Sequence, residues 1–469
     1  MNNQLSFDFL NDLLAPLYEE EPNTNSNYSV YRPIHYLGSK LRLLDAIIAN
    51  IDKVDPSMGT VCDLFSGSGT VAMALSKSRN VIAVDIQEYS RVICSALLGS
   101  RPTDEAVYKK LYEFLRSSEY STQLLDALKP IIEYEQQCLN LASKGELEPL
   151  CDFLEHGSLV AFQLDTSNSS SPNLKKTIEE VLSNLHGIGL ENSNKTLCVR
   201  YFGGIYFSFL QSVQLDILLE AISQVPNDSK DVFMAALLST ASEAVNTVGK
   251  QFAQPLRPRR SNGEPKHKLY ELTSRDRYKD IFEIYENWLA RYLNNPSSDY
   301  SHVVIREDYL DALDALSDKV DVIYADPPYT RDHYSRFYHV LETLCLRDTP
   351  AVSKVRVGSS DFISRGLYRQ ERHQSPFSIK SQAPSAFSNL FEKSSRLGVP
   401  LVLSYSPYIS ANNARPRLMT IQQIEDLAKR FYKHVDIVSA GKISHSKLNR
   451  SDKNTIVSYE AEVMFVCEL

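Results

Sequence analysis

Two glycines lie in a motif whose spacing suits the binding of a nucleotide-like ligand. The apolar run Val61–Phe65 predicts a buried strand, and Gly67 and Gly69 follow it in a turn that leads into a helical pattern. Glycine has no Cβ, so a ligand can approach the backbone of this turn closely. Asp85 ends the next predicted strand, where a carboxylate can bind ribose hydroxyls. The spacing Gly67-x-Gly69-x-x-Ala72 also fits a dinucleotide fingerprint, so NAD remains an alternative ligand on this motif alone.

A carboxylate, two prolines and an aromatic ring follow a second buried strand. Asp326, Pro327, Pro328 and Tyr329 come directly after the apolar run Val320–Ala325. The prolines fix φ and remove backbone donors, which predicts a rigid turn at the end of a strand where open α/β sheets bind ligands. A carboxylate and a carbonyl there can accept both N–H bonds of the adenine amine and direct its lone pair toward a methyl donor. The tyrosine can stack on a base that has left the helix.

A third motif, Tyr36-Leu37-Gly38-Ser39-Lys40, precedes the first predicted strand. The ammonium of Lys40 can bind a ligand carboxylate of the kind that methionine presents. A structural alternative is compatible with this role, because Ser39 can cap the helix that the apolar spacing predicts from residue 41 to 51.

The elements around these motifs predict an α/β fold. Strand 61–65, the glycine turn, helix 70–77 and strand 81–85 form a βαβ unit of the parallel-sheet type. Residues 103–293 show helical periodicity and almost no strand signal. Further elements are predicted as strands 302–306, 320–325, 399–405, 435–439 and 461–466, a helix 387–396 and a long loop 358–384. We therefore expect a Rossmann-like sheet with a large, mainly helical insertion. The expected divisions are an acidic lead-in (1–30), a catalytic domain (31–100 with 300–469) and the insertion (101–299).

Composition and charge exclude several classes of protein. The 469 residues carry a net charge of −8 and are 43% hydrophobic, and no apolar run approaches the roughly 20 residues of a membrane helix. The first thirty residues contain no Lys or Arg, unlike a secretory signal, and the seven cysteines are scattered, so we expect a cytoplasmic protein without a metal site. The segment from residue 250 to residue 279 contains nine basic residues and three acidic ones. Arg257, Arg259 and Arg260 form a Pro-flanked basic loop there that suits phosphate or guanine contacts, or simply a solvated loop.

The three motifs and their order resemble those of the DNA N6-adenine methyltransferases in the alpha arrangement, which use S-adenosylmethionine. The resemblance covers residues 31–100 and 300–345. It implies that the insertion recognises the DNA sequence.

The resemblance also implies roles for individual residues. In the cofactor site, Tyr36 and Lys40 would contact the methionine end, Phe65 would pack near the sulfonium and Asp85 would bind the ribose. Asp308 would meet the adenine of the cofactor, and the turn from Asp63 to Gly69 would complete the site. At the target, Asp326 and the Pro327 carbonyl would orient the amine, beside Pro328, and Tyr329 would stack. Tyr334, Tyr338, His339 and Glu342 follow at near-helical spacing; they would line the pocket of the flipped base, or pack as an amphipathic helix on the sheet.

The expected function is therefore site-specific methylation of adenine N6 in double-stranded DNA, with S-adenosylmethionine as methyl donor. A restriction or defence protein is a possible partner. Two alternatives are methylation of adenine in RNA and a DNA-binding protein that has lost catalysis. The intact Asp326 and Phe65 argue against the loss of catalysis.

Overall fold

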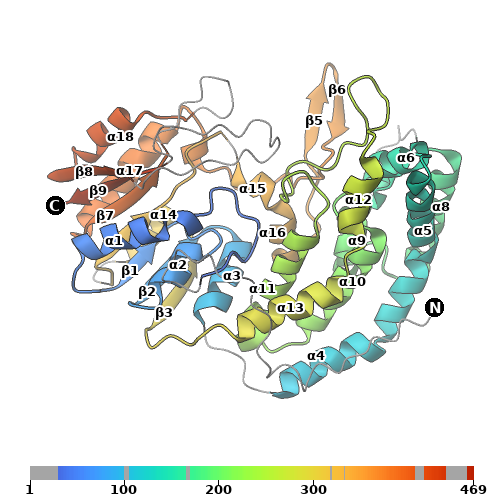
Figure 1. Ribbon diagram of the computed structural model, residues 1–469, viewed down its shortest axis with the longest axis horizontal. Coiled ribbons are helices and arrows are strands. Elements are labelled where there is room, and N and C mark those ends of the chain that lie inside the picture. Colours follow the sequence, from blue (N-terminus) through green and yellow to red (C-terminus); the bar gives the residue numbers. More distant parts are fainter. Residues whose placement is uncertain are drawn as a thin grey trace.

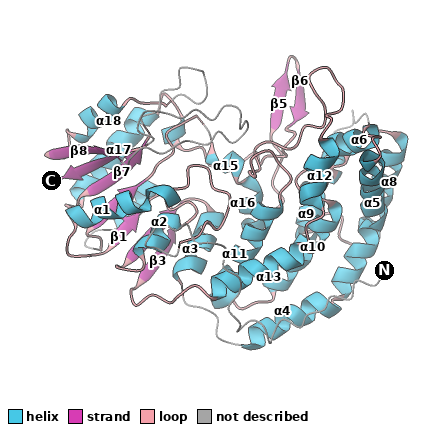
Figure 2. Ribbon diagram, in the orientation of Figure 1, coloured by secondary structure: helices cyan, strands magenta, loops and turns pink. Residues whose placement is uncertain are grey.

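A seven-stranded sheet forms one half of the molecule (Figures 1 and 2). The computed structural model describes residues 30–99, 105–164, 170–316, 319–331, 333–406, 417–439 and 462–469, so nearly all of the predicted lead-in lies outside the described residues. The strand order is β3-β2-β1-β4-β7-β9-β8, in which the first five strands are parallel and β9 runs antiparallel to both of its neighbours. The strands are β1 (Val61–Asp63), β2 (Val81–Asp85), β3 (His302–Arg306), β4 (Val322–Ala325), β7 (Leu401–Tyr405), β8 (His434–Ser439) and β9 (Val463–Glu468). This topology confirms the predicted Rossmann-like α/β class.

Helices cover both faces of the sheet because successive strand side chains point to opposite sides. Val61 and Val81 pack on one face with α1 (Leu44–Val54), α2 (Thr70–Leu75) and α3 (Glu88–Leu98). Cys62 and Ile82 pack on the other face with α14 (Tyr309–Ala315), α17 (Ala383–Arg396) and α18 (Ile421–Ala428). Strands buried on both faces are typical of parallel sheets, which explains their uninterrupted apolar runs.

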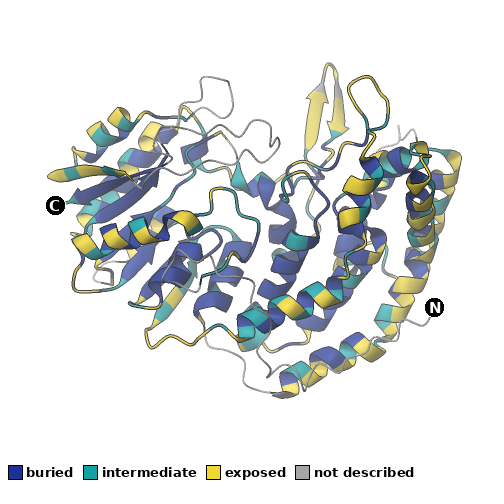
Figure 3. Cartoon of the chain, viewed as in Figure 1, coloured by how far each residue is buried: buried dark blue, intermediate teal, exposed yellow. Residues whose placement is uncertain are grey.

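The described residues of the insertion are mainly helical, as predicted, with a long loop between residues 245 and 268. Its helices are α4 (Glu105–Ser117), α5 (Glu119–Ser143), α6 (Glu148–His156), α7 (Leu159–Leu164), α8 (Pro172–Gly187), α9 (Leu197–Tyr201), α10 (Phe209–Ser223), α11 (Asn227–Ala244), α12 (Leu269–Arg277) and α13 (Ile281–Leu293). The helices α10 and α11 are central and buried on nearly every side, whereas α4, α5 and α8 expose their outer faces (Figure 3).

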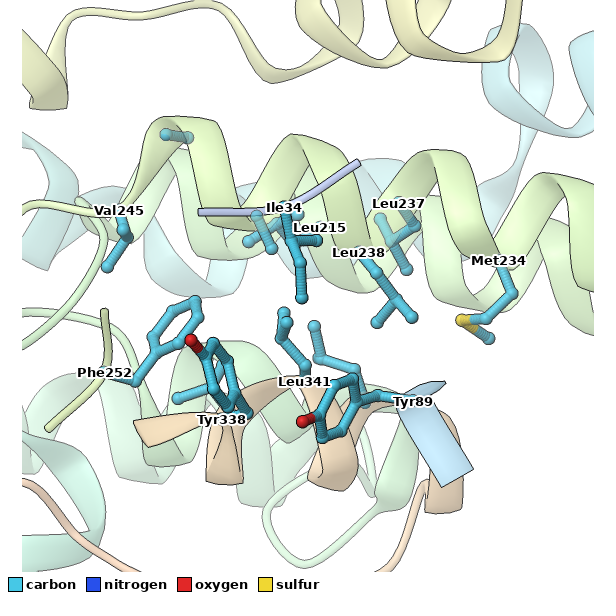
Figure 4. Packing of buried hydrophobic residues seen from close by; sticks show 14 of the residues in the cluster. Ile34, Tyr89, Leu215, Met234, Leu237, Leu238, Val245, Phe252, Tyr338 and Leu341 are labelled. Atoms are coloured by element: carbon cyan, nitrogen blue, oxygen red, sulfur yellow. The ribbon is translucent and has the colours of Figure 1, made fainter. Parts of the chain in front are cut away.

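The insertion and the sheet share one continuous hydrophobic core. Helix α11 packs against α3 and against α16 (His339–Leu346). In this contact Met234 and Leu238 of α11 face Tyr89 of α3 and Leu341 of α16 (Figure 4). The division of the chain into a catalytic domain and an insertion stays a prediction, and the shared core means that the two parts support each other.

Several boundaries differ from the sequence expectations. The strand expected at 61–65 ends at Asp63, because the glycine turn begins there, and α17 begins four residues earlier than the predicted helix. The predicted loop 358–384 was wrong in its first part. Strands β5 (Lys354–Val357) and β6 (Ser360–Ile363) form a hairpin around the turn at Gly358, which has φ of +63°. A short α15 (Tyr334–Phe337) precedes α16.

Among the described residues, no helix combines the length and the apolar character that crossing a membrane requires.

Candidate active site

The topology of the sheet brings the two main motifs together. Strands β1 and β4 are neighbours, with Cys62 paired to Ile323, so the glycine turn and the turn that begins at Asp326 leave the same edge of the sheet. A cavity opens at this edge, where the strand order reverses, which is the usual ligand site of open α/β sheets. The predicted residues that line it are Tyr36, Lys40, Asp63, Phe65, Asp85, Asp308, Asp326, Pro328 and Tyr334.

A buried ion-pair network holds Asp326. The ammonium of Lys40 lies 2.8 Å from Oδ2 of Asp326 and 3.0 Å from Oε1 of Glu462, which directly precedes β9. Burial alone would lower the pKa of Lys40, but Asp326 and Glu462 raise it well above its usual value. Burial raises the pKa of Asp326 to about 6, against the lowering effect of Lys40 and with a further rise from Glu462. The second oxygen of Asp326, Oδ1, is buried without a hydrogen-bond partner among the described residues.

Tyr329 lies beside the same network but does not line the cavity. Its hydroxyl donates to Oε1 of Glu462 over 3.4 Å, and the Lys40 ammonium lies 5.6 Å from the centre of its ring. The guanidinium of Arg417 lies 4.8 Å from the same ring, and Tyr405 packs edge-on against it. Asp326 therefore lines the cavity, and the lysine that pairs with it also lies beside the ring of Tyr329.

Two further carboxyl groups line the cavity, and they differ in their hydrogen-bond partners. Asp85 accepts N–H bonds from Gly67 and Gln87, each of 2.9 Å, which oppose the rise of its pKa that burial causes. Asp63 is 1% exposed, and neither of its oxygens has a partner among the described residues. Burial, followed by the charges of Asp326 and Asp85, raises the pKa of Asp63 to about 8. A cation bound beside Asp63 would favour the ionised form of this carboxyl group.

The two glycines of the turn meet protein atoms rather than open space. A Cβ on Gly67 would lie 2.5 Å from the hydroxyl of Tyr36, and a Cβ on Gly69 would lie 2.8 Å from Leu97 of α3. Both residues also have positive φ, which glycine adopts without strain. The placement of Gly69 indicates that it allows α3 to pack on the turn, so the predicted contact with a cofactor is not the reason for this glycine.

The remaining predicted cofactor residues lie along one wall of the cavity. Phe65 packs with Tyr309 and Phe377, whose ring centres both lie 5.5 Å away. Asp308 caps α14 by accepting the N–H of Leu310 over 2.9 Å. His373 also lines this wall, and sequence reasoning did not find it.

Of the four residues predicted in the helices after the second motif, one lines the cavity and three pack in the interior. Tyr334 lines the cavity, and its hydroxyl donates to the carbonyl of Leu37 over 3.3 Å. Tyr338 stacks on Tyr36 at 5.0 Å, and Glu342 accepts two N–H bonds at the start of α3. His339 is 1% exposed, and burial lowers its pKa to about 3. The expectation that His339 contacts DNA does not fit this burial, so for these three residues the packing alternative applies.

The basic loop is only partly available to a ligand. Arg257 and Arg260 are exposed. Arg259 forms ion pairs with Glu148 at 2.7 Å and Glu155 at 2.9 Å on α6. Because these pairs anchor the loop to α6, Arg259 fits a structural role better than the predicted contact with DNA.

Glu462 and Arg417 are the main site residues that sequence reasoning missed. Neither lies in a motif, and each reaches Tyr329 only through tertiary contacts. Glu462 falls inside the strand predicted at 461–466, and a single acidic residue in a predicted strand is too common to be diagnostic.

Comparison with known families agrees with this geometry. The family model for D12 class N6 adenine-specific DNA methyltransferase matches residues 36–137 and 266–365. Over these two segments the chain is similar to this class. The matched segments contain the glycine turn, Asp85, Asp308 and the turn at Asp326. The segment between them, which includes α10, α11 and the basic loop, lies outside the match.

The chain is also similar to three known methylases. Type II methyltransferase M.NlaIII of Neisseria lactamica is 24% identical over 408 residues, which cover 86% of this chain and 89% of the relative. Modification methylase LlaI of Lactococcus lactis subsp. lactis is 23% identical over 405 residues, which cover 85% of this chain and 49% of the relative. Type II methyltransferase M.FokI of Planomicrobium okeanokoites is 22% identical over 370 residues, covering 77% and 43%. The chain thus spans about half the length of two of these relatives. No solved structure matches it significantly.

Proposed function

We propose that this chain transfers a methyl group from S-adenosylmethionine to N6 of an adenine that has left double-stranded DNA. The observation that carries the proposal is Oδ1 of Asp326, a buried oxygen without a hydrogen-bond partner among the described residues, on a side chain that lines the cavity. A carboxylate in that place can accept an N–H bond of the amine while the other oxygen stays paired to Lys40. Similarity to an adenine-specific class supports the same substrate.

The residues of the cavity suit S-adenosylmethionine, which supplies an electrophilic methyl group on a sulfonium. Its ammonium would pair with Asp63, whose two oxygens have no partner among the described residues. Its ribose hydroxyls would reach Asp85, and Phe65 would lie near the positive sulfur. Two carboxylates and an aromatic ring favour a cationic ligand over the pyrophosphate of NAD, for which the cavity lining offers one lysine.

In the proposed reaction the protein orients the amine and needs no covalent intermediate. Asp326 and the Pro327 carbonyl would accept the two N–H bonds, so that the nitrogen lone pair points toward the cavity. With a pKa of about 6, Asp326 is mostly ionised at pH 7 and is an acceptor. Tyr329 would stack on the base and recover part of the stacking energy lost on flipping, roughly 1–3 kcal/mol per base. A restriction or defence partner protein stays a prediction.

Substitution of Asp326 tests the proposal directly. Asp326→Ala should bind duplex DNA and S-adenosylmethionine within a modest factor of wild type, because its task belongs to the transition state. Single-turnover transfer of a tritiated methyl group should collapse. The matched control is Asp299→Asn, an exposed aspartate in the loop before β3, which should transfer at the wild-type rate.

Three results would contradict parts of the proposal. Near-normal transfer by Asp326→Ala would remove its catalytic assignment. Transfer by wild type to RNA but to no DNA would change the substrate and keep the chemistry. Calorimetric binding of NAD in place of S-adenosylmethionine would overturn the cofactor.

A further inference from the structure

Five basic side chains lie outside the cavity lining, four of them around Tyr368; the guanidinium of Arg336 lies 5.8 Å from the centre of the Tyr368 ring. They come from the loop between α11 and α12, from α15 and from the segment after β6, and we name them the basic rim: Arg257, Lys266, Arg336, Arg365 and Arg372. Burial raises the pKa of Tyr368, and four of these arginines lie close enough to lower it. Partial burial and the charges of Arg365 and Arg257 lower the pKa of Lys266.

The basic rim lacks the carboxylate partners that other arginines of this chain have. Arg79, Arg277 and Arg369 each form ion pairs of 2.7 Å or less. Within the described part of the chain no member of the basic rim forms one. Arg365 and Arg372 donate to backbone carbonyls, and Nε of Arg336 and of Arg372 is buried without an acceptor. The nearby Glu155 is already paired with Arg259.

The basic rim adjoins the cavity. Arg336 directly follows Tyr334 and Ser335, and Arg372 directly precedes His373, and all three of these neighbours line the cavity. In Figure 1 the hairpin β5–β6 rises between α15 and α12. The segment that follows it contacts the loop before α12, where Arg365 donates to the carbonyl of Leu256 over 2.7 Å, and reaches the cavity at His373. A ligand of the basic rim would therefore lie beside the site of methyl transfer.

The charge of the basic rim identifies the class of ligand. S-adenosylmethionine carries a positive charge at its sulfur, so five further positive charges would repel its sulfonium group and are not explained by the proposed cofactor. An unpaired cluster of like charges is unfavourable unless an anion binds it. The charges come from three separated segments, which suits a chain of phosphates better than one small anion, and guanidinium groups pair with phosphates in a bidentate manner.

We propose that the basic rim binds backbone phosphates of the DNA strand that carries the target adenine, next to the flipped nucleotide. This inference rests on the proposed function. Phosphate contacts fix the position of a duplex without reading its sequence. The basic rim would thereby hold the strand while one base rotates toward Asp326.

The test measures how DNA affinity depends on salt. In the triple variant Arg257→Gln, Arg365→Gln, Arg372→Gln, the slope of log affinity against log salt should flatten by about 0.9 for each lost phosphate contact. Fluorescence anisotropy with a short duplex gives the slope. Affinity should fall equally for duplexes with and without the target adenine. Arg396→Gln, an exposed arginine of α17, is the matched control and should keep the wild-type slope. Calorimetry should give unchanged affinity for S-adenosylmethionine.

Each other outcome separates this inference from the proposed function. A wild-type slope in the triple variant, with methylation of DNA intact in both proteins, would overturn the basic rim alone. A loss of affinity confined to one DNA sequence would show base contacts and overturn the phosphate assignment. A parallel loss of cofactor affinity would show a structural role and overturn it too. If wild type binds no duplex, the inference and the proposed DNA substrate fail together.

Discussion

At the scale of residues, the site depends on how two carboxyl groups share one buried ammonium while a third stays unpaired among the described residues. Lys40 pairs with both Asp326 and Glu462, while Asp63 has no partner among the described residues. The groups that bear on the charge of Asp326 are Lys40, Glu462, Asp63, Tyr324 and Tyr329. Glu462 contacts both Lys40 and Tyr329, and its charge also raises the pKa of Asp326 directly.

Replacing Glu462 by Gln should move the acidic limb of the pH–rate profile. Asp326 must be ionised to accept the amine, so the rate should fall as the pH drops through its pKa of about 6. Glu462 raises that pKa. When Glu462 is neutralised, Asp326 becomes the sole carboxylate among the described residues that forms an ion pair with Lys40. Both effects lower the pKa of Asp326 and shift the limb to lower pH. Single-turnover rates between pH 5 and 8 measure the shift; Glu462→Asp, which keeps the charge, should retain the wild-type limb. An identical limb in Glu462→Gln would exclude this electrostatic coupling.

At the scale of elements, a side chain from α16 caps a helix of the cofactor site. Glu342 accepts the N–H groups of Glu88 and Tyr89 over 3.1 and 3.0 Å, and no side chain of α3 caps its own N-terminus. The start of a helix leaves donors without intrahelical partners, and a carboxylate there also complements the helix dipole. Because α3 follows Asp85 directly, this cap ties the helices after the second motif to the cofactor site.

Glu342→Ala should destabilise the protein by about 1–2 kcal/mol, the usual cost of losing a helix cap. Glu342→Gln keeps one acceptor oxygen and should cost less. Urea unfolding measures both, and Glu179→Ala, an exposed glutamate of α8, is the control. Equal stability of Glu342→Ala and wild type would mean that water replaces the cap.

At the scale of the whole molecule, the shared core predicts that the insertion and the sheet unfold together. Leu238 of α11 is fully buried against the layer formed by α3 and α16 (Figure 4). Leu238→Ala should cost about 2–5 kcal/mol, because it leaves a cavity in a packed core. The free energy of unfolding in urea should fall in one cooperative transition, with weaker binding of S-adenosylmethionine. Leu210→Ala, on an exposed face of α10, should change little. Two separate transitions, of which only one moves, would contradict a shared core.

Local patterns were sufficient for the fold class and for the two main motifs. A glycine turn or a double proline restricts its own backbone, and an uninterrupted apolar strand requires a parallel sheet covered on both faces. Once Asp63 and Asp326 end parallel strands, adjacent strands bring them to the same edge. These features depend on neighbours in the sequence, so composition and spacing predicted them, together with the helical nature of the insertion.

Only the tertiary structure decided which side chains are available for chemistry. Glu462 meets Lys40 from the opposite end of the described chain, Arg259 pairs with α6, and His339 is buried among aromatic rings. Arg365 and Arg372 lie in a segment that the sequence suggested was only a loop, and packing places Arg365 near Arg257 and Arg372 near Arg336. Pairing and burial arise between segments far apart in the sequence, so no local spacing encodes them. The sequence thus determined which groups could react, and the packing of distant segments determined which of them face a ligand.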